Sequence, residues 1–231
     1  MKYQALATDY DGTIAFEGKV DEATADALRR VREAGIRLVM VTGRELADLF
    51  NIFEQTTLFD RVVAENGAVL YDPVSASVEV LADAPPPELV RRLTAAGVPI
   101  SVGHSVVATV EPFEHAVLDA IRDLGIEWHV IFNKGSVMAL PADITKATGL
   151  THALAALDVP PERAVGVGDA ENDQAFLRIC GLAAAVDNAL PAVKDMAHIV
   201  TRSSRGAGVT ELIERLLTGD LDHLVVPSVR T

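Results

Sequence analysis

The sequence predicts an α/β protein, with a doubly wound parallel sheet as its core and an inserted α+β unit. Strands and helices alternate over the first 80 residues and again after residue 145, a rhythm typical of a parallel sheet covered by helices on both faces. Between these stretches, proline-containing breaks at 84–87 and 141–143 enclose a helix-strand-strand pattern that occurs twice. Apolar residues make up 49% of the 231 residues and few are aromatic, as in proteins with buried parallel strands.

Apolar runs and amphipathic segments place the elements of the first stretch. Asp21 has the residue type of a helix N-cap, and Gly35 ends the helix that follows it. Asn66-Gly67 opens a hairpin-like pair of strands, with Asp72-Pro73 as the turn between them. We expect strands at 3–8, 36–41, 61–64, 68–71 and 77–81, and helices at 22–34 and 45–54.

The inserted unit is expected to form its own α+β layer. Its expected helices are 88–96 and 112–124, the second with Pro112 in its first turn, and its expected strands are 98–102, 106–110, 127–132 and 136–140. The α/β rhythm then resumes with strands at 164–168, 182–186 and 197–201 and helices at 145–157, 175–179, 190–196 and 209–217. For the tail, 220–231, packing of its apolar residues on its own domain is favoured over packing on a partner chain.

Charge and cysteine content argue against several functional classes. A formal net charge of −13 argues against nucleic acid or an anionic membrane as partner. We expect no signal peptide and no membrane span, and therefore a cytoplasmic protein. Cys180, the single cysteine, rules out a disulfide within the chain and is expected to be a small buried residue. An anionic substrate would need a bound cation and one or two Lys or Arg residues to invert the local field.

Two carboxylates leave the end of the first expected strand. Asp9 and Asp11 are two residues apart, so they point the same way in extended chain, and Gly12 lets the chain turn away. Two close carboxylates repel each other, and a divalent cation or one raised pKa would resolve that conflict. The alternative for this stretch alone is a strand end followed by an Asx-type turn.

Other expected strands also end in polar residues. Thr42-Gly43-Arg44, Glu65-Asn66-Gly67 and the acidic run 169–173 each follow a strand. Ligands of open parallel sheets bind beyond the carboxyl ends of the strands, so these clusters would meet in one crevice. Taken singly, the first and the last of them also fit ordinary helix N-termini. Two acidic clusters at equivalent strand ends instead favour a cation with oxygen ligands, Mg²⁺.

The order of these motifs resembles the haloacid dehalogenase (HAD) superfamily of phosphatases. The matching residues are Asp9-Tyr10-Asp11-Gly12-Thr13, Thr42-Gly43-Arg44, Lys146 and Gly168-Asp169-Ala170-Glu171-Asn172-Asp173, spread over nearly the whole chain. The inserted unit looks like the cap of the Cof-type, or C2B-capped, subgroup, which includes archaeal-type phosphoglycolate phosphatases and sugar-phosphate phosphatases. The resemblance implies a Rossmann-like core of residues 1–83 and 142–231 with an α+β cap of residues 84–141.

The resemblance also implies the chemistry. It implies a Mg²⁺-dependent phosphatase that acts on a small phosphorylated metabolite through an aspartyl-phosphate. Asp9 would be the nucleophile, Asp11 would protonate the leaving alcohol and then deprotonate water, and Lys146 would offset negative charge. The implied phosphate or substrate contacts are Thr42, Gly43, Arg44 and Asn172, and the implied metal ligands are Asp9, the backbone carbonyl of Asp11, Asp169 and Asp173. Arg44 fits an ion pair equally well.

The cap sequence carries less information. Its candidates for facing the crevice are His104, Ser105, Trp128, His129, Asn133 and Lys134. Lys134 is also the nearby alternative to Lys146, although a solvated turn explains it too. The remaining histidines, at 115, 152, 198 and 223, lack metal-ligand spacing.

Two alternatives to a phosphatase stay open. One is a phosphotransferase or mutase of the same fold, similar to phosphomannomutases, which would move phosphate to an acceptor sugar. The other is a catalytically silent metabolite-binding protein, which would have no need for both Asp9 and Asp11. The substrate and the choice between monomer and homodimer cannot be derived from the sequence. A nucleotide-binding oxidoreductase is set aside, because no Gly-rich turn follows the first strand.

Overall fold

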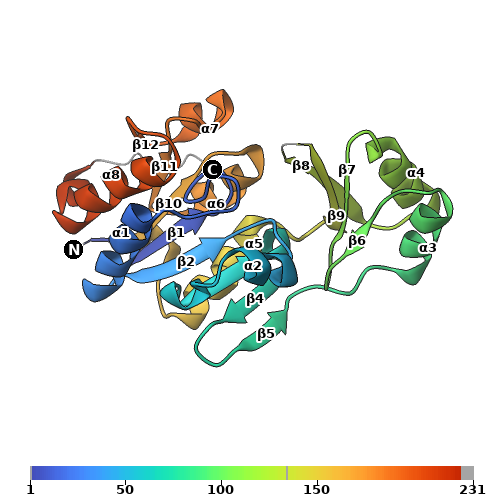
Figure 1. Cartoon of the computed structure of the whole chain (residues 1–231), viewed down its shortest axis with the longest axis horizontal. Helices are drawn as coiled ribbons and strands as arrows, with labels where there is room; N and C mark the ends of the chain where they lie inside the picture. Colours follow the sequence, from blue (N-terminus) through green and yellow to red (C-terminus); the bar gives the residue numbers. More distant parts are fainter. Residues whose placement is uncertain (1, 134, 225–231) are drawn as a thin grey trace.

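The protein contains two β-sheets that lie side by side in a computed structural model, which describes residues 2–133 and 135–224 (Figure 1). The larger sheet has eight strands in the order β12-β11-β10-β1-β2-β3-β4-β5, and the smaller has four in the order β6-β7-β9-β8. We call residues 87–141, which form the smaller sheet and its two helices, the cap. The predicted α/β core with an inserted α+β unit is confirmed.

The larger sheet combines a parallel centre with an antiparallel edge. All pairings from β12 to β3 are parallel, while β4 pairs antiparallel with both β3 and β5. Its strands are β1 (Ala5–Asp9), β2 (Arg37–Val41), β3 (Arg61–Ala64), β4 (Val69–Asp72), β5 (Ser77–Val80), β10 (Ala164–Gly168), β11 (Leu182–Ala185) and β12 (Ile199–Val200).

Helices cover both faces of this sheet because its crossovers run in opposite directions. From β1 the chain moves to β2, and from β10 it moves the other way to β11, so right-handed crossovers place α1 and α6 on opposite faces. Helix α1 packs against α8, and α5 packs against α6. The helices are α1 (Glu22–Glu33), α2 (Leu46–Ile52), α5 (Lys146–Ala156), α6 (Gln174–Ile179), α7 (Pro191–Met196) and α8 (Arg205–Leu217), with short 3₁₀ turns η1 (Thr56–Leu58), η2 (Glu65–Gly67), η3 (Pro161–Arg163), η4 (Glu171–Asp173) and η5 (Asp220–His223).

The cap places two helices on one face of an antiparallel sheet. It consists of α3 (Pro87–Ala95), β6 (Ser101–Val102), β7 (Val107–Val110), α4 (Glu114–Leu124), β8 (Trp128–Asn133) and β9 (Ser136–Pro141). Val107, Val137 and Ala139 pack with the helices in a small hydrophobic cluster of the cap itself. Residues one position along the same strands, such as Met138 and Leu140, join the hydrophobic cluster of the larger sheet. The sheet therefore turns its second face toward the core.

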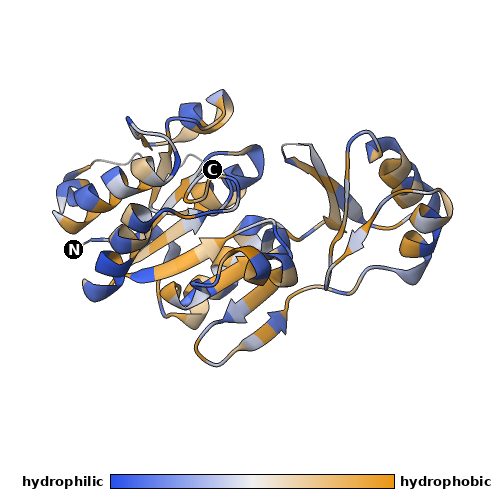
Figure 2. Ribbon diagram, viewed as in Figure 1, coloured by the Kyte–Doolittle hydropathy of each residue, from blue (hydrophilic) through white to orange (hydrophobic). Residues whose placement is uncertain are grey.

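Hydrophobic residues are concentrated on the strands of the larger sheet, whereas hydrophilic residues are frequent on the outer helices (Figure 2). Asp21 is the N-cap of α1, as predicted, and its carboxylate accepts a hydrogen bond from the Thr24 N–H. Cys180 is buried and free, and burial raises the pKa of its thiol to about 12. Cys180 is therefore the small buried residue that the sequence predicts.

Several predicted boundaries are wrong. The second cap helix begins at Glu114, because Pro112 lies inside a turn that the Phe113 N–H closes on the Val110 carbonyl. Strand β6 has two residues, since the preceding Val98 N–H is bonded to the end of α3. Helix α8 begins at Arg205 rather than at residue 209. Its first turns contain two glycines, which are poor helix formers but leave room for close packing here.

The described part of the tail packs on its own chain. Leu221 in η5 is fully buried, and Leu224 packs against the same hydrophobic cluster. This agrees with the expected packing of the tail on its own domain as far as residue 224. Residues 225–231 lie outside the described part of the chain.

Candidate active site

The carboxyl ends of β1 and β10 lie next to each other at the centre of the larger sheet. Ala5 to Thr8 pair in register with Ala164 to Val167, so Asp9 at the end of β1 is close to Asp169, just after β10. The strand order reverses between these two strands, and open α/β sheets bind ligands at such a point. The register thus explains why residues 160 positions apart share one site.

Three buried carboxylates meet at this point. Oxygens of Asp9, Asp169 and Asp173 all lie within 4.8 Å of one another. Their negative charges repel in a place where water cannot screen them. A hard divalent cation would remove this repulsion, and oxygen ligands are the ones that Mg²⁺ prefers. The donor set therefore fits the metal that the sequence predicts.

Lys146 supplies positive charge from the first residue of α5. Its Nζ donates hydrogen bonds of 2.6 Å to Asp9 Oδ1 and to Asp173 Oδ1, with only 1% of the side chain exposed. Thr145 caps the helix and forms a capping box with Thr148. Gly67 permits the approach, because a Cβ there would lie 1.9 Å from the Thr145 carbonyl oxygen.

The charges of this cluster shift the pKa values of its members. Burial raises the pKa of Asp9 to about 7, and the neighbouring Asp173 and Asp169 add to the shift while Lys146 opposes it. Burial also works against the charge on Lys146, but Asp173 and Asp9 outweigh it and hold the pKa of the ammonium above its usual range. Without a bound metal ion, the three carboxylates therefore carry more negative charge than the Lys146 ammonium can offset.

Asp173 is held by the backbone as well as by Lys146. Its Oδ2 accepts hydrogen bonds from the N–H groups of Asp169, at 2.8 Å, and Ala170, at 2.9 Å. Both of its oxygens thus have protein donors, and the carboxylate fixes the loop that carries Asp169. We conclude that Asp173 supports Asp169 by holding the backbone of its loop.

Two further residues, which were not predicted from the sequence, hold the acidic cluster in place. The Thr13 hydroxyl donates to Asp9 Oδ2 at 3.0 Å, and Asn188 Nδ2 donates to the Gly12 carbonyl at 2.8 Å and to Asp169 at 3.4 Å. Thr13 was visible as the last residue of the first motif. Asn188 lies three residues after the end of β11. The sequence feature that could have indicated it is the same one as at the other strands, a polar residue that follows a strand.

Asp11 and Arg44 form an ion pair beside the cluster of three carboxylates. Arg44 donates from Nε and Nη2 to the two oxygens of Asp11, at 2.7 and 2.8 Å, and from Nη1 to Asp48 at 2.5 Å. The Asp11 carboxylate is thus paired with Arg44, lines the pocket with it and is not one of the three clustered carboxylates. Arg44 fulfils the ion-pair interpretation while remaining at the pocket wall.

The predicted phosphate-binding residues Thr42, Gly43 and Asn172 have contacts of different kinds. Thr42 is buried, and its hydroxyl accepts a hydrogen bond from the Arg44 N–H at 3.1 Å. Gly43 lines the pocket, with the Asn66 side chain packed against it. Asn172 donates to Asn66 Oδ1 at 2.9 Å, so it links the acidic loop to the turn after β3.

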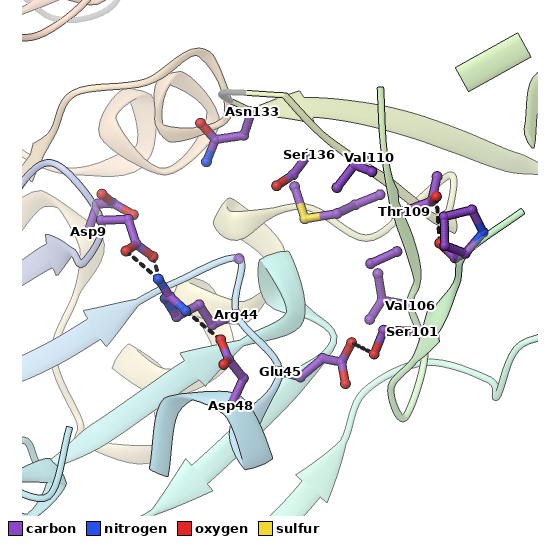
Figure 3. A pocket seen from close by; sticks show the side chains of 15 residues that line it. Asp9, Arg44, Glu45, Asp48, Ser101, Val106, Thr109, Val110, Asn133 and Ser136 are labelled. Carbon is purple, nitrogen blue, oxygen red and sulfur yellow. Dashed lines mark hydrogen bonds and ion pairs between the residues drawn. The ribbon is translucent and has the colours of Figure 1, made fainter. Parts of the chain in front are cut away.

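A pocket of about 600 Å³ opens from this site between the core and the cap (Figure 3). The core contributes Asp9, Asp11, Gly43, Arg44, Glu45 and Asp48, and the cap contributes Pro99, Ser101, Val106, Ala108, Thr109, Val110, Asn133, Ser136 and Met138. The Ser101 hydroxyl donates to Glu45 at 2.6 Å and so joins the two walls at one edge. The volume suits a small molecule.

Of the cap residues expected as candidates for facing the crevice, some line the pocket and others do not. Asn133 lines the pocket, as expected. His104 and Ser105 do not line it and instead bind Glu65, and Trp128 lines a second hollow beside the connections between core and cap. These three candidates do not face the pocket, because the loop and strand turn their side chains elsewhere. His129 is also absent from the pocket lining, and Lys134 lies outside the described residues.

Comparison with known proteins identifies the family of the chain. A family model described as haloacid dehalogenase-like hydrolase matches residues 6–96 and 113–213. The chain belongs to this family. It is 30% identical over 226 residues to a phosphoglycolate phosphatase of Methanothermobacter thermautotrophicus, covering 93% of this chain and 99% of the relative. A phosphoglycolate phosphatase of Pyrobaculum aerophilum is 28% identical over 228 residues, covering 95% and 98%.

Solved structures show the same fold. A haloacid dehalogenase-like hydrolase from Bacteroides thetaiotaomicron superposes with a TM-score of 0.77 at 20% identity and covers 93% of this chain and 99% of its own. A HAD/COF-like hydrolase from Plasmodium vivax gives a TM-score of 0.80 at 18% identity, covering 94% and 96%. The resemblance predicted from the sequence is confirmed, and the protein is a hydrolase of this family. Within residues 2–133 and 135–224, every helix is too short or too polar to cross a membrane.

Proposed function

We propose that this hydrolase is a Mg²⁺-dependent phosphatase that acts on a small phosphorylated metabolite through an aspartyl-phosphate on Asp9. One observation carries the proposal. Asp9 is buried at the floor of a small-molecule pocket, with the Lys146 ammonium 2.6 Å from one of its oxygens and two further carboxylates beside it. This arrangement is costly for stability and suits a nucleophile that works with a cation.

Mg²⁺ would be held by Asp9, Asp169 and the backbone carbonyl of Asp11, with Asp173 behind them or acting through water. The fit of this donor set rests on the buried cluster of three carboxylates. The bound ion would neutralise the repulsion between the carboxylate and the phosphate dianion. Asp173 supports the site by holding Lys146 and the backbone of the Asp169 loop.

Asp9 attacks phosphorus in this proposal. Its oxygen forms a bond to phosphorus while the bond from phosphorus to the substrate oxygen breaks, and the electron pair leaves with that oxygen. Lys146 offsets the negative charge that gathers around Asp9, and Thr13 holds the second oxygen of the same carboxylate. Water then attacks the phosphoryl group and releases inorganic phosphate and free Asp9.

Asp11 transfers the proton in both steps. It gives a proton to the leaving oxygen and later takes one from the attacking water. Its position at the pocket wall, paired with Arg44 and outside the cluster of three carboxylates, supports this role. Thr42, the Gly43 amide and Asn172 are proposed to bind the phosphate oxygens, with Arg44 toward the substrate.

For the substrate, we propose a sugar phosphate or a phosphoglycolate-like acid. The support is the pocket of about 600 Å³ and the phosphoglycolate phosphatase names of the relatives. A panel of phosphorylated metabolites, with phosphate release as readout and Mg²⁺ present, tests the proposal. We expect turnover that EDTA and Asp9→Asn both abolish. Full activity of Asp9→Asn would contradict it, and phosphate appearing on an added acceptor sugar would indicate a phosphotransferase instead.

A further inference from the structure

One fully buried carboxylate has no part in the proposed chemistry. Glu65 follows β3, and its side chain is 0% exposed. It begins the turn η2, in which Glu65, Asn66 and Gly67 all have positive φ, at 50°, 53° and 112°. Two of these residues are not glycine, so the chain pays a conformational cost to hold this turn. A buried charge on such a turn needs partners that compensate for its desolvation.

Among the described residues, the hydrogen-bond partners of the Glu65 side chain all come from the cap. Oε1 accepts hydrogen bonds from the His104 N–H at 3.0 Å and lies 3.0 Å from the ring Nδ1 of His104, and Oε2 accepts from the Ser105 N–H at 3.0 Å. Gly103 completes the contact, because a Cβ there would lie 2.7 Å from the carboxylate carbon. The carboxylate is thus enclosed by the loop of residues 103–105, between β6 and β7.

The other side of the turn is fastened to the phosphate end of the proposed site. The Glu65 N–H donates to the Arg44 carbonyl at 3.0 Å, and the Asn66 N–H donates to the Thr42 carbonyl at 3.1 Å. The Asn66 side chain contacts both Asn172 and the Met138 sulfur. A single turn therefore touches the segment 42–44, the acidic loop and the cap.

The loop held by Glu65 leads directly into the cap wall of the pocket. Ser101 lies just before it on β6, while Val106 and Ala108 lie just after it, and all three line the pocket. A shift of residues 103–105 would therefore move this wall relative to Asp9 and Arg44. The distance between the two walls decides which leaving groups fit.

We propose that Glu65 is a positioning residue that docks the cap on the core and thereby sets substrate selectivity. This rests on the proposed phosphatase function. A carboxylate differs from an apolar contact in that water can solvate it when the loop departs. The hydrogen bonds from the loop favour the docked state, and because water can replace them, the cap can still open for a substrate to enter. Removing the carboxylate leaves the loop N–H groups without acceptors and loosens the cap wall.

The test compares Glu65→Ala with a matched variant inside the core. Asp60→Ala also removes a largely buried carboxylate that accepts from a backbone N–H, that of Leu38 at 2.8 Å, but Asp60 contacts no cap residue in the described hydrogen bonds. Hydrogen exchange of the full chain is measured over residues 101–108. We expect exchange at residues 104 and 105 to quicken about tenfold or more in Glu65→Ala and to stay unchanged in Asp60→Ala.

Steady-state kinetics with p-nitrophenyl phosphate give the second readout. We expect Glu65→Ala to raise KM about tenfold with kcat within about twofold of the parent enzyme, because binding contacts with the wall are lost while the chemistry at Asp9 is kept. Glu65→Gln keeps the side-chain size and should also raise KM with little change in kcat, but by a smaller factor, even if Glu65→Ala folds poorly. Asp60→Ala should lower thermal stability without raising KM.

Unchanged exchange at residues 104 and 105 in both Glu65 variants would overturn the proposal. So would a fall in kcat with constant KM, which would mean that Glu65 serves the chemistry or only the stability of the core. The exchange readout does not depend on activity. If the parent enzyme releases phosphate from no ester, the proposed function fails, and the exchange experiment still decides whether Glu65 docks the cap.

Discussion

The two walls of the pocket differ in both charge and origin. The core wall carries Asp9, Asp11, Arg44, Glu45 and Asp48, so every residue that it supplies except Gly43 is charged. The cap wall, among the residues that the structure describes, is neutral and mixes small apolar side chains with hydroxyl and amide groups. Core residues lie at or just after the ends of parallel strands, apart from Asp48 in α2, whereas cap residues lie mainly along one face of an antiparallel sheet.

This difference separates reaction from recognition. The core wall is tied into ion pairs and buried hydrogen bonds, so its geometry is rigid and its substitution is costly. The cap wall is joined to it by the Glu65 contacts and the hydrogen bond between Ser101 and Glu45. We therefore expect substitutions in the core wall to alter the chemical step and substitutions in the cap wall to alter which substrate binds.

The largest effect should come from Asp9→Asn, which removes the proposed nucleophile from the core wall. We expect kcat to fall about 1,000-fold or more, because an amide is a poor nucleophile toward phosphorus. The measurement is phosphate release from the best substrate of the panel. Asp119→Asn, which changes an exposed side chain of α4 in the cap, is the control and should keep full activity. Similar activity in both variants would contradict the claim that the core wall carries out the chemical step.

Lys146→Met should have the next largest effect, at about 100-fold in kcat, since it leaves Asp9 and Asp173 without their shared cation. It should also make stability more dependent on pH. Without Lys146, the pKa of Asp9 rises further above its unfolded value of 3.8. The folded state then binds more protons than the unfolded state, so stability falls as pH rises from about 4 through that pKa.

The melting temperature of Lys146→Met and of the parent protein, measured at pH 5 and pH 8, checks this sign. The gap between the two proteins should widen toward pH 8. A gap that narrows toward pH 8 would mean that the carboxylates do not repel one another in the folded state.

Mg²⁺ should stabilise the protein by a smaller amount that also depends on pH. Because burial raises the pKa of Asp9 to about 7, protons compete with the cation in acid, and the cation relieves the repulsion above that pH. At millimolar Mg²⁺ and pH 8, we expect the melting temperature to rise by about 5 °C, with a smaller rise at pH 5. An equal rise in Asp169→Asn would place the ion elsewhere.

The smallest effect should come from the cap wall. Asn133→Ala removes an amide from the pocket without touching the charged cluster. We expect kcat/KM for the best metabolite to fall about threefold to tenfold through KM, with kcat nearly constant. The corresponding change at the core wall, Asp9→Asn, acts on kcat. A large loss of kcat in Asn133→Ala would show that the cap takes part in the chemistry.

The core of the fold could be predicted because its signals are local. Alternating strands and helices indicated the parallel sheet, and polar residues at strand ends indicated where Asp9, Asp169 and Asp173 would meet. Lys146 was found through its motif, and its contact with Asp9 depends on how Gly67 lets α5 approach. The helix boundary at α8 was missed because glycines needed for packing also look like helix breakers.

The cap could not be predicted to the same depth. His104 and Ser105 have side chains suited to binding a substrate, yet their positions depend on a contact with Glu65, about 40 residues earlier. Nothing local in the sequence indicates that contact. Asn188 was missed for a related reason, since its hydrogen bonds to Gly12 and Asp169 join segments that are distant along the chain.

Trapping the phosphorylated enzyme tests the central claim most directly. The protein is mixed with excess substrate and Mg²⁺, quenched in acid within the first turnovers, digested, and analysed by mass spectrometry. We predict a phosphoryl group on the peptide that contains Asp9, and its absence in Asp9→Asn and in the parent protein treated with EDTA. Phosphate release without any phosphorylated Asp9 peptide, or a phosphoryl group on another residue, would contradict the account.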